Sequence, residues 1–220
     1  MSIACNNLPR QDWLMRVLCG VALGMMGVAS VLAATAESGT VVVAEPNVVA
    51  IPAEAQGLFD EALQALQAGQ TEQANLSFKE LVARYPTFSS PLINLGIMEQ
   101  KANRHEAAIG YFKRALQLDA TSVLANTNLG MSYRQLGQFK AAEAAYLAAI
   151  AADPAYARVH LNLGVLYDMY LQQPQQAIQE YETYQSLQSS PDAKVDKWLK
   201  DVKGRLNLMA AKTEAMEVRP

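Results

Sequence analysis

The chain has 220 residues, 51% of them apolar and 18% charged, and a formal net charge of −3. This balance, without a strong basic patch, argues against nucleic acid as a partner. There is no glycine-rich phosphate loop and no nucleophile elbow, and the only histidines, His105 and His160, lie far apart in the sequence. We therefore predict that the protein is not an enzyme and binds no cofactor or metal.

The N-terminus has the layout of a secretory signal. Two arginines precede an uncharged apolar run, residues 17–34, and Ala34-Thr35-Ala36 offers small residues suited to cleavage. We predict that residues 1–36 form a signal peptide and that the protein is exported to the periplasm. An 18-residue run can also just span a bilayer. The alternative is therefore an uncleaved anchor in the inner membrane, with the rest of the chain outside the cytoplasm and no other membrane contact.

Residues 37–54 follow as a short segment of different character. They contain Pro46, Pro52 and two valine clusters, and we interpret them as an extended linker.

A short string then recurs three times at a spacing of 34 residues: Asn94-Leu95-Gly96, Asn128-Leu129-Gly130 and Asn162-Leu163-Gly164. In the first two copies, an alanine, an aromatic residue and a second alanine follow at matching positions. These are Ala108, Phe112 and Ala115 in one copy, and Ala142, Tyr146 and Ala149 in the next. A period of this length is typical of stacked helix pairs.

The pattern resembles the tetratricopeptide repeat (TPR). The frame extends back to residue 55, although Glu61-Ala62 replaces Leu-Gly there. It extends forward to residue 190 if one residue is inserted near 171–174. The resemblance implies an all-α fold, a right-handed superhelical solenoid of about four TPR helix pairs with a C-terminal capping helix. The TPR domain would cover 55–190, in units 55–88, 89–122, 123–156 and 157–190.

Glycine in the middle of a helix costs about 1 kcal/mol relative to alanine, so three glycines at one phase indicate a packing role. We expect Ala108 and Ala142 to face them, and the aromatic residues to fill the space between units. Gly69 and Gly137 are expected to cap helices in the left-handed conformation. The expected helices are 55–68, 71–84, 89–102, 105–118, 123–136, 139–152, 157–171 and 174–188.

Residues 191–207 are predicted to form the capping helix. Apolar residues recur there at helical spacing, with charged residues on the other faces, and we expect Trp198 to cover the last repeat. Residues 208–220 are predicted to be a disordered tail.

In TPR domains the first helices of successive units line a concave groove that binds extended peptides, so the resemblance implies a partner site there. Asn94, Asn128 and Asn162, termed here the asparagine ladder, could bond a peptide backbone, because an amide both donates and accepts. The alternative is that these amides bond within their own helices or to water. The predicted partner-binding residues are Asn94, Ile97, Lys101, Leu124, Asn128, Met131, Arg134, Arg158, Leu161, Asn162, Val165 and Asp168. The family's clamp for a terminal carboxylate is doubtful, because too few lysines and arginines lie near this groove.

The sequence thus predicts a non-catalytic protein–protein interaction scaffold or adaptor of the cell envelope, with a protein or an extended peptide as partner. The alternatives are a membrane-anchored TPR adaptor and an accessory subunit of an envelope machine or enzyme. Pilus, secretion, outer-membrane assembly and energy-transduction systems are the candidate settings.

Overall fold

A computed structural model describes residues 51–217, with side chains described up to residue 213. The predicted signal peptide and most of the predicted linker lie outside these residues. In the described part the chain is all-helical: α2 (Ala53–Gln67), α3 (Thr71–Arg84), α4 (Ser89–Lys101), α5 (His105–Leu118), α6 (Val123–Gln135), α7 (Phe139–Ala152), α8 (Ala157–Met169), α9 (Pro174–Ser186) and α10 (Ala193–Glu217). No helix between residues 51 and 217 is both long and apolar enough to cross a membrane.

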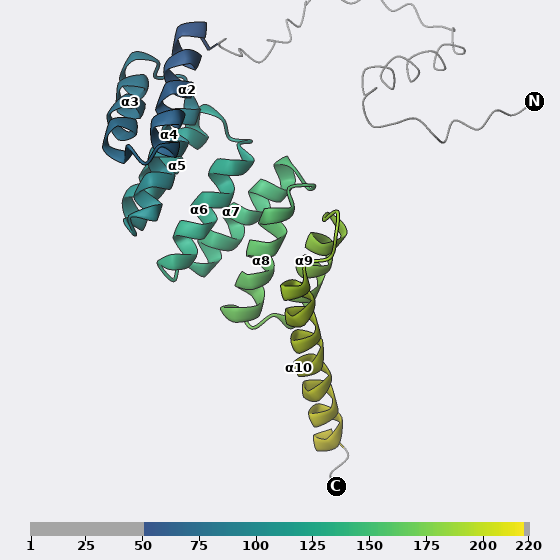
Figure 1. The fold of residues 1–220 in the computed structure, drawn as a ribbon. Coiled ribbons are helices and arrows are strands. Elements are labelled where there is room, and N and C mark those ends of the chain that lie inside the picture. The colour runs from purple at the N-terminus through teal and green to yellow at the C-terminus, as the bar shows by residue number, and fades with distance from the viewer. Residues whose placement is uncertain (1–50, 218–220) are drawn as a thin grey trace, which may run out of the picture. The chain divides into compact units, whose positions relative to one another are not determined.

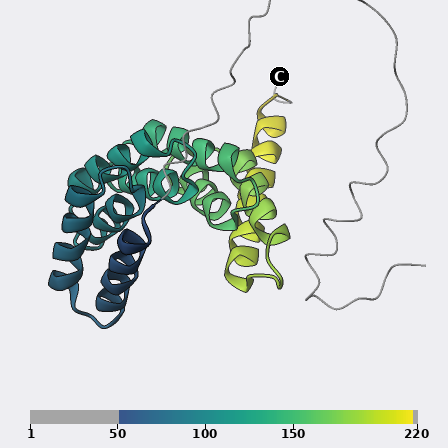
Figure 2. The same ribbon diagram turned by 90° about the horizontal axis from the view of Figure 1, so that it is seen from above.

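The helices pair in chain order, as expected for a solenoid. α2 packs with α3, α4 with α5, α6 with α7 and α8 with α9, and each pair contacts the next. Figures 1 and 2 show the pairs following one another in a curved row. Each of the eight helices begins and ends within two residues of its expected position. The predicted fold class, four helix pairs followed by a capping helix, is confirmed.

The turns between the two helices of each pair explain why the observed helix bounds agree with the expected ones. One residue in each turn has positive φ: Gly69 at 77°, Asn103 at 57°, Gly137 at 71° and Gln172 at 54°. Glycine adopts this conformation without steric cost, and asparagine tolerates it better than most residues. The spacing is 34 residues twice and then 35, so the extra residue predicted near 171–174 lies in the turn between α8 and α9.

The mid-helix glycines do lie at tight contacts, but our prediction of what they contact was wrong. A Cβ on each glycine would come closest to an aromatic ring of the second helix in the same pair, and not to Ala108 or Ala142. The distance from this added Cβ to the nearest ring atom is 2.5 Å for Gly96 and Phe112, 2.5 Å for Gly130 and Tyr146, and 2.6 Å for Gly164 and Tyr181. The aromatic residue follows the alanine by one helical turn, on the same face, and its longer side chain reaches over the bare glycine backbone.

These rings also form the centre of the core. Phe78, Phe112 and Tyr146 are fully buried and Tyr181 is 1% exposed. Tyr146 and Tyr181 belong to one cluster that also contains apolar residues of α8 and α10. Each ring therefore closes its own pair and contributes to the apolar contact that joins successive pairs.

The capping helix α10 covers the last pair. Val195, Leu199 and Val202 are buried in the cluster shared with α8 and α9, and the Trp198 ring lies 5.8 Å from that of Tyr181. Asp192 caps the helix, because its Oδ1 accepts the Lys194 backbone N–H at 2.9 Å and that of Val195 at 3.3 Å.

The end of α10 corrects a second prediction. We expected the helix to end at residue 207 and a disordered tail to follow, but α10 continues to Glu217. Residues 205–217 contain no proline or glycine and are rich in leucine, methionine, alanine, glutamate and lysine, which favour helix. Figure 1 shows this part of α10 extending away from α8 and α9.

Candidate partner-binding surface

The predicted partner-binding residues all lie on the first helices α4, α6 and α8, and α6 contacts both of its neighbours. We call the surface they form the first-helix face. Lys101, Leu124 and Arg158 are exposed there and Asn128 is buried, at 9% exposure. Seven of the other predicted residues are partly exposed: Asn94, Ile97, Met131, Arg134, Leu161, Asn162 and Val165. The last, Asp168, has a side chain that is largely covered.

The asparagine ladder is bonded within its own helices at two of three positions. Asn94 donates to the Ser90 carbonyl at 3.0 Å, and Asn128 donates to the Leu124 carbonyl at 2.8 Å. The Asn162 Nδ2 atom is buried and has no hydrogen-bond partner among the described residues. An amide has two N–H groups and an accepting oxygen, so each local bond leaves one N–H and the oxygen. The role of the ladder in partner binding therefore remains a prediction.

Gln100 joins two units next to the asparagine ladder. Its Nε2 donates to the Asn128 carbonyl at 3.2 Å and to the Ser132 hydroxyl at 3.1 Å. Both acceptors belong to α6, and Ser132 is fully buried. These bonds join α4 to α6 beside the Asn128 position of the ladder.

Arg134 contributes a cation to the same face. Its guanidinium lies 5.7 Å from the centroid of the Tyr170 ring, a distance at which a cation is attracted to a ring face. The Tyr146 hydroxyl is buried and has no hydrogen-bond partner in the described structure. Burial raises the pKa of Tyr146 to about 12, and the nearby Arg134 charge acts in the opposite direction.

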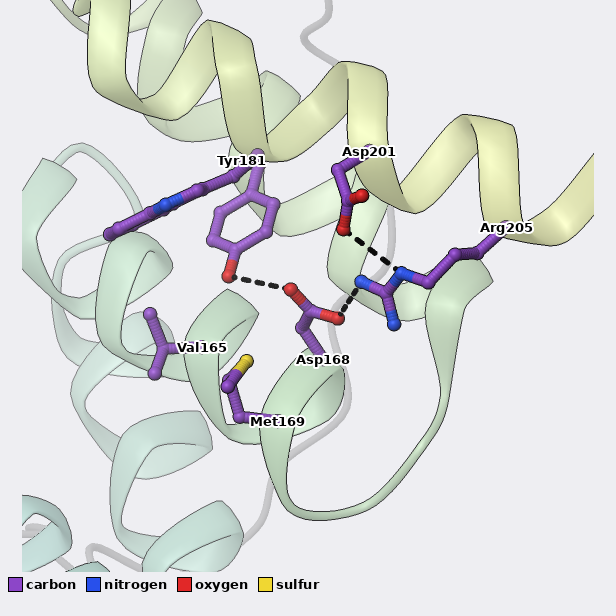
Figure 3. Close-up of a pocket in the computed structure, with 7 residues that line it drawn as sticks. Val165, Asp168, Met169, Tyr181, Asp201 and Arg205 are labelled. Atoms are coloured by element: carbon purple, nitrogen blue, oxygen red, sulfur yellow. Dashed lines mark hydrogen bonds and ion pairs between the residues drawn. The ribbon is translucent and has the colours of Figure 1, made fainter.

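Asp168 is covered by the capping helix, a contact that the sequence did not indicate. Its carboxylate accepts from Arg205 Nη2 of α10 at 2.5 Å and from the Tyr181 hydroxyl at 3.5 Å. Arg205 Nε also donates to Asp201 at 3.0 Å, so the guanidinium bridges two carboxylates (Figure 3). The Asp168 side chain is only 7% exposed.

A pocket of about 500 Å³ opens beside this ion pair, where α8, α9 and α10 meet (Figure 3). It is lined by Val165, Asp168, Met169, Tyr181, Trp198, Asp201 and Arg205. A second pocket of about 400 Å³ shares Asp168, Met169 and Arg205 and is completed by Gln172, Pro174 and Met209. We predicted Val165 and Asp168 as site residues, but the residues from α9 and α10 were missed, because we treated α10 as a cover only.

Two further ion pairs near these helices join neighbouring helices. His160 is 5% exposed, with Nδ1 2.7 Å from Glu180 and Nε2 3.0 Å from the Pro154 carbonyl. Glu182, two residues along α9, instead pairs with Lys203 of α10 at 2.6 Å. Within the described residues, no group of three potential ligands is placed to hold a metal ion.

Comparison with known families places this arrangement in a class. Residues 53–123 match the family described as Tetratricopeptide repeat, and residues 130–169 match a second described as TPR repeat. The chain carries tetratricopeptide repeats, which are generally non-enzymatic modules for protein–protein interaction. A search of curated protein sequences found no match.

Solved structures show the same fold. A structure described as MamA 41-end from Desulfovibrio magneticus RS-1 is 25% identical, with a TM-score of 0.62, over 77% of this chain and 97% of that one. PilF of Pseudomonas aeruginosa is 22% identical, with a TM-score of 0.62, over 72% of each chain. The first TPR of Spaghetti (RPAP3), bound to the HSP90 peptide SRMEEVD, is 21% identical, with a TM-score of 0.51, over 54% of this chain and 93% of that one.

Proposed function

We propose that this protein is a non-catalytic scaffold of the cell envelope and that its first-helix face binds an extended segment of a partner protein. The observation that carries the proposal is the asparagine ladder, three amides at equivalent positions of successive units. The similar RPAP3 domain, which holds a peptide, supports the general mode. The N-terminal sequence supports export.

The chemistry of the face suits an extended peptide. A peptide backbone in that conformation presents N–H and C=O groups at regular intervals, and an amide can pair with both. Asn94 is partly exposed and keeps one N–H and its oxygen beside its local bond, whereas Asn128 and the Asn162 nitrogen are buried. Partly exposed apolar side chains, among them Met131, Leu161 and Val165, lie on the same helices. Backbone bonds would then supply affinity, and the apolar neighbours would select side chains of the partner.

The first experiment locates the partner on the protein. A photo-crosslinking amino acid replaces Leu124 on α6, which is 41% exposed, or Leu147 on α7, which is 47% exposed. The two leucines lie on different faces of the protein but are about equally exposed, so each serves as the control for the other. We expect partner adducts, identified by mass spectrometry in cells, from position 124 only. Adducts from position 147 alone would place the site on the second helices.

The second experiment tests the ladder on the partner so identified. Replacing all three asparagines with alanine removes bonds worth about 0.5–1.5 kcal/mol each, so we expect affinity to fall about ten-fold or more. The matched control replaces three exposed glutamines of the second helices, Gln73, Gln117 and Gln179, with alanine. Circular dichroism checks folding of both variants. Equal affinity of the two would exclude the ladder as the binding element.

The second candidate is an adaptor that keeps residues 17–34 in the membrane as an anchor. The uncharged length of this run favours it. Intact-mass measurement on the exported protein separates the candidates, because cleavage after Ala36 removes residues 1–36 from the measured mass.

A further inference from the structure

The pocket between α8 and α10 has the features of a binding subsite. Its volume of about 500 Å³ lies within the range of roughly 300–1,000 Å³ typical of ligand pockets. Val165, Met169 and Trp198 supply apolar walls from two helices, and the carboxylates and guanidinium supply polar groups on another side (Figure 3). Met169 is 68% exposed, so part of the apolar lining faces solvent.

The polar side of the pocket is already ordered. Arg205 uses Nε and Nη2 to hold Asp201 and Asp168, and these bonds fix the plane of the guanidinium. Its Nη1 group makes no hydrogen bond within the described residues, so two N–H donors remain for a backbone carbonyl beside the pocket. The pocket therefore combines an apolar space with donors that are positioned before any partner binds.

The ionic groups that line the pocket are two carboxylates and one guanidinium, a net charge of −1, so the unpaired cations lie on the face around it. Within the described residues, Lys101, Arg134 and Arg158 form no ion pair, and Asp168 is paired with Arg205. Burial raises the pKa of the Tyr181 hydroxyl in the pocket, and the charges of Arg205 and Arg134 act in the opposite direction. Arg134 does not line the pocket, but its guanidinium lies 5.7 Å from the ring centroid of Tyr170, the residue that follows Met169 of the pocket lining.

We propose that the pocket binds a large apolar side chain of the partner segment, such as leucine, methionine or phenylalanine, and that an acidic side chain beside it pairs with Arg134. The proposal rests on the proposed function and names the chemistry of the segment at the C-terminal end of the first-helix face. It also makes α10 a wall of the binding site in addition to a cap.

Synthetic decapeptides of serine and glycine test the proposal, with leucine, phenylalanine or alanine at one central position and glutamate or lysine beside it. The chain has two tryptophans, so the full-length Trp13→Phe variant leaves Trp198 as the only indole, and its emission reports on the pocket. We expect the leucine–glutamate and phenylalanine–glutamate peptides to change this emission on binding. Replacement of the apolar residue by alanine, or of glutamate by lysine, should weaken binding about ten-fold.

Two pairs of variants complete the test. Met169→Glu should lower the affinity for the leucine–glutamate peptide about ten-fold. Leu147→Glu introduces the same charge at an exposed leucine of α7 and should change that affinity less than about two-fold. Arg134→Gln should remove the preference for glutamate over lysine. Arg158→Gln removes the same positive charge at the N-terminal end of α8, whereas the pocket lies at the C-terminal end of that helix, so this variant should retain the preference.

The outcomes separate this proposal from the proposed function. The proposal for the pocket is refuted if peptides bind without preference for the apolar residue, or if they bind Met169→Glu as well as they bind the unmodified protein. If the triple asparagine-to-alanine variant still binds those peptides more weakly, the first-helix face is retained as the binding site. Binding that neither set of variants changes overturns both proposals. Failure of every peptide to bind overturns the pocket as a site for this class of segment.

Discussion

Gly130→Ala should destabilise the protein relative to the same substitution at Gly110. Both glycines lie inside helices, where alanine is favoured by about 1 kcal/mol. At Gly110 a new Cβ meets nothing within 4 Å, but at Gly130 it comes to 2.5 Å from the Tyr146 ring. The ring is fully buried, so it must shift within a packed core, at a cost of about 1–3 kcal/mol.

Thermal unfolding followed by circular dichroism measures the difference. The gain in helix propensity is common to both variants and cancels in the comparison, which leaves the packing cost of about 1–3 kcal/mol. At about 2–4 °C per kcal/mol for a chain of this size, Gly130→Ala should melt about 2–12 °C below Gly110→Ala. Adding Tyr146→Leu, which removes the ring, should reduce that gap, since the two residues are in contact.

Equal melting temperatures for the two variants would refute the contact between Gly130 and Tyr146. A gap that persists unchanged with Tyr146→Leu would assign the cost to another neighbour. The first unit has Ala62 where the others have glycine, and Ala62 is buried beside the Phe78 core. A helix pair can therefore accommodate a Cβ at this position when its other residues pack around it. The expected loss of stability in Gly130→Ala arises because the Tyr146 ring already packs where the new Cβ would lie.

Tyr146→Phe should raise the melting temperature slightly, because it removes a buried hydroxyl without a hydrogen-bond partner. Tyr167→Phe should lower the melting temperature, because the Tyr167 hydroxyl donates to Glu143 at 2.9 Å and hydrogen bonds to charged groups contribute about 1.5–3 kcal/mol. A shift in the same direction for the two tyrosine variants would contradict this difference in hydrogen bonding. Asp192 has a pKa below its ordinary value, chiefly because the Lys194 backbone N–H bonds its carboxylate. Its contribution to the cap of α10 should be present above that ordinary pKa and be lost as the pH falls through the lowered one, so the melting temperatures of wild type and Asp192→Asn should converge in acid and differ at neutral pH.

The fold could be predicted closely from the sequence because it repeats. A period of 34 residues places every helix once a single pair is recognised, and the extra residue before Pro174 was visible as a break in that period. The partner of Gly130 was not predictable in the same way. Periodicity gives the face on which a residue lies, but the reach of the Tyr146 side chain decides which atom makes the contact.

The candidate site could be predicted only where it repeats. The ladder positions and their helices were identified, since three units share them. The pocket depends on Trp198 and Arg205 of α10, which belong to no repeat, and Arg205 lies 37 residues from Asp168 in the sequence. No spacing rule connects a unique helix to a repeated one, so the ion pair and the pocket were found only in three dimensions.

The spacing of the left-handed turn residues has a consequence for how such a protein changes in size. Between residues 69 and 137 the spacing is constant, so duplication of one 34-residue unit there inserts a helix pair without changing the contacts at either end. The 35-residue step lies in the last pair, beside the residues that α10 covers. The interior can therefore gain or lose a whole helix pair, whereas removal of α10 would expose the core that it shares with the final pair.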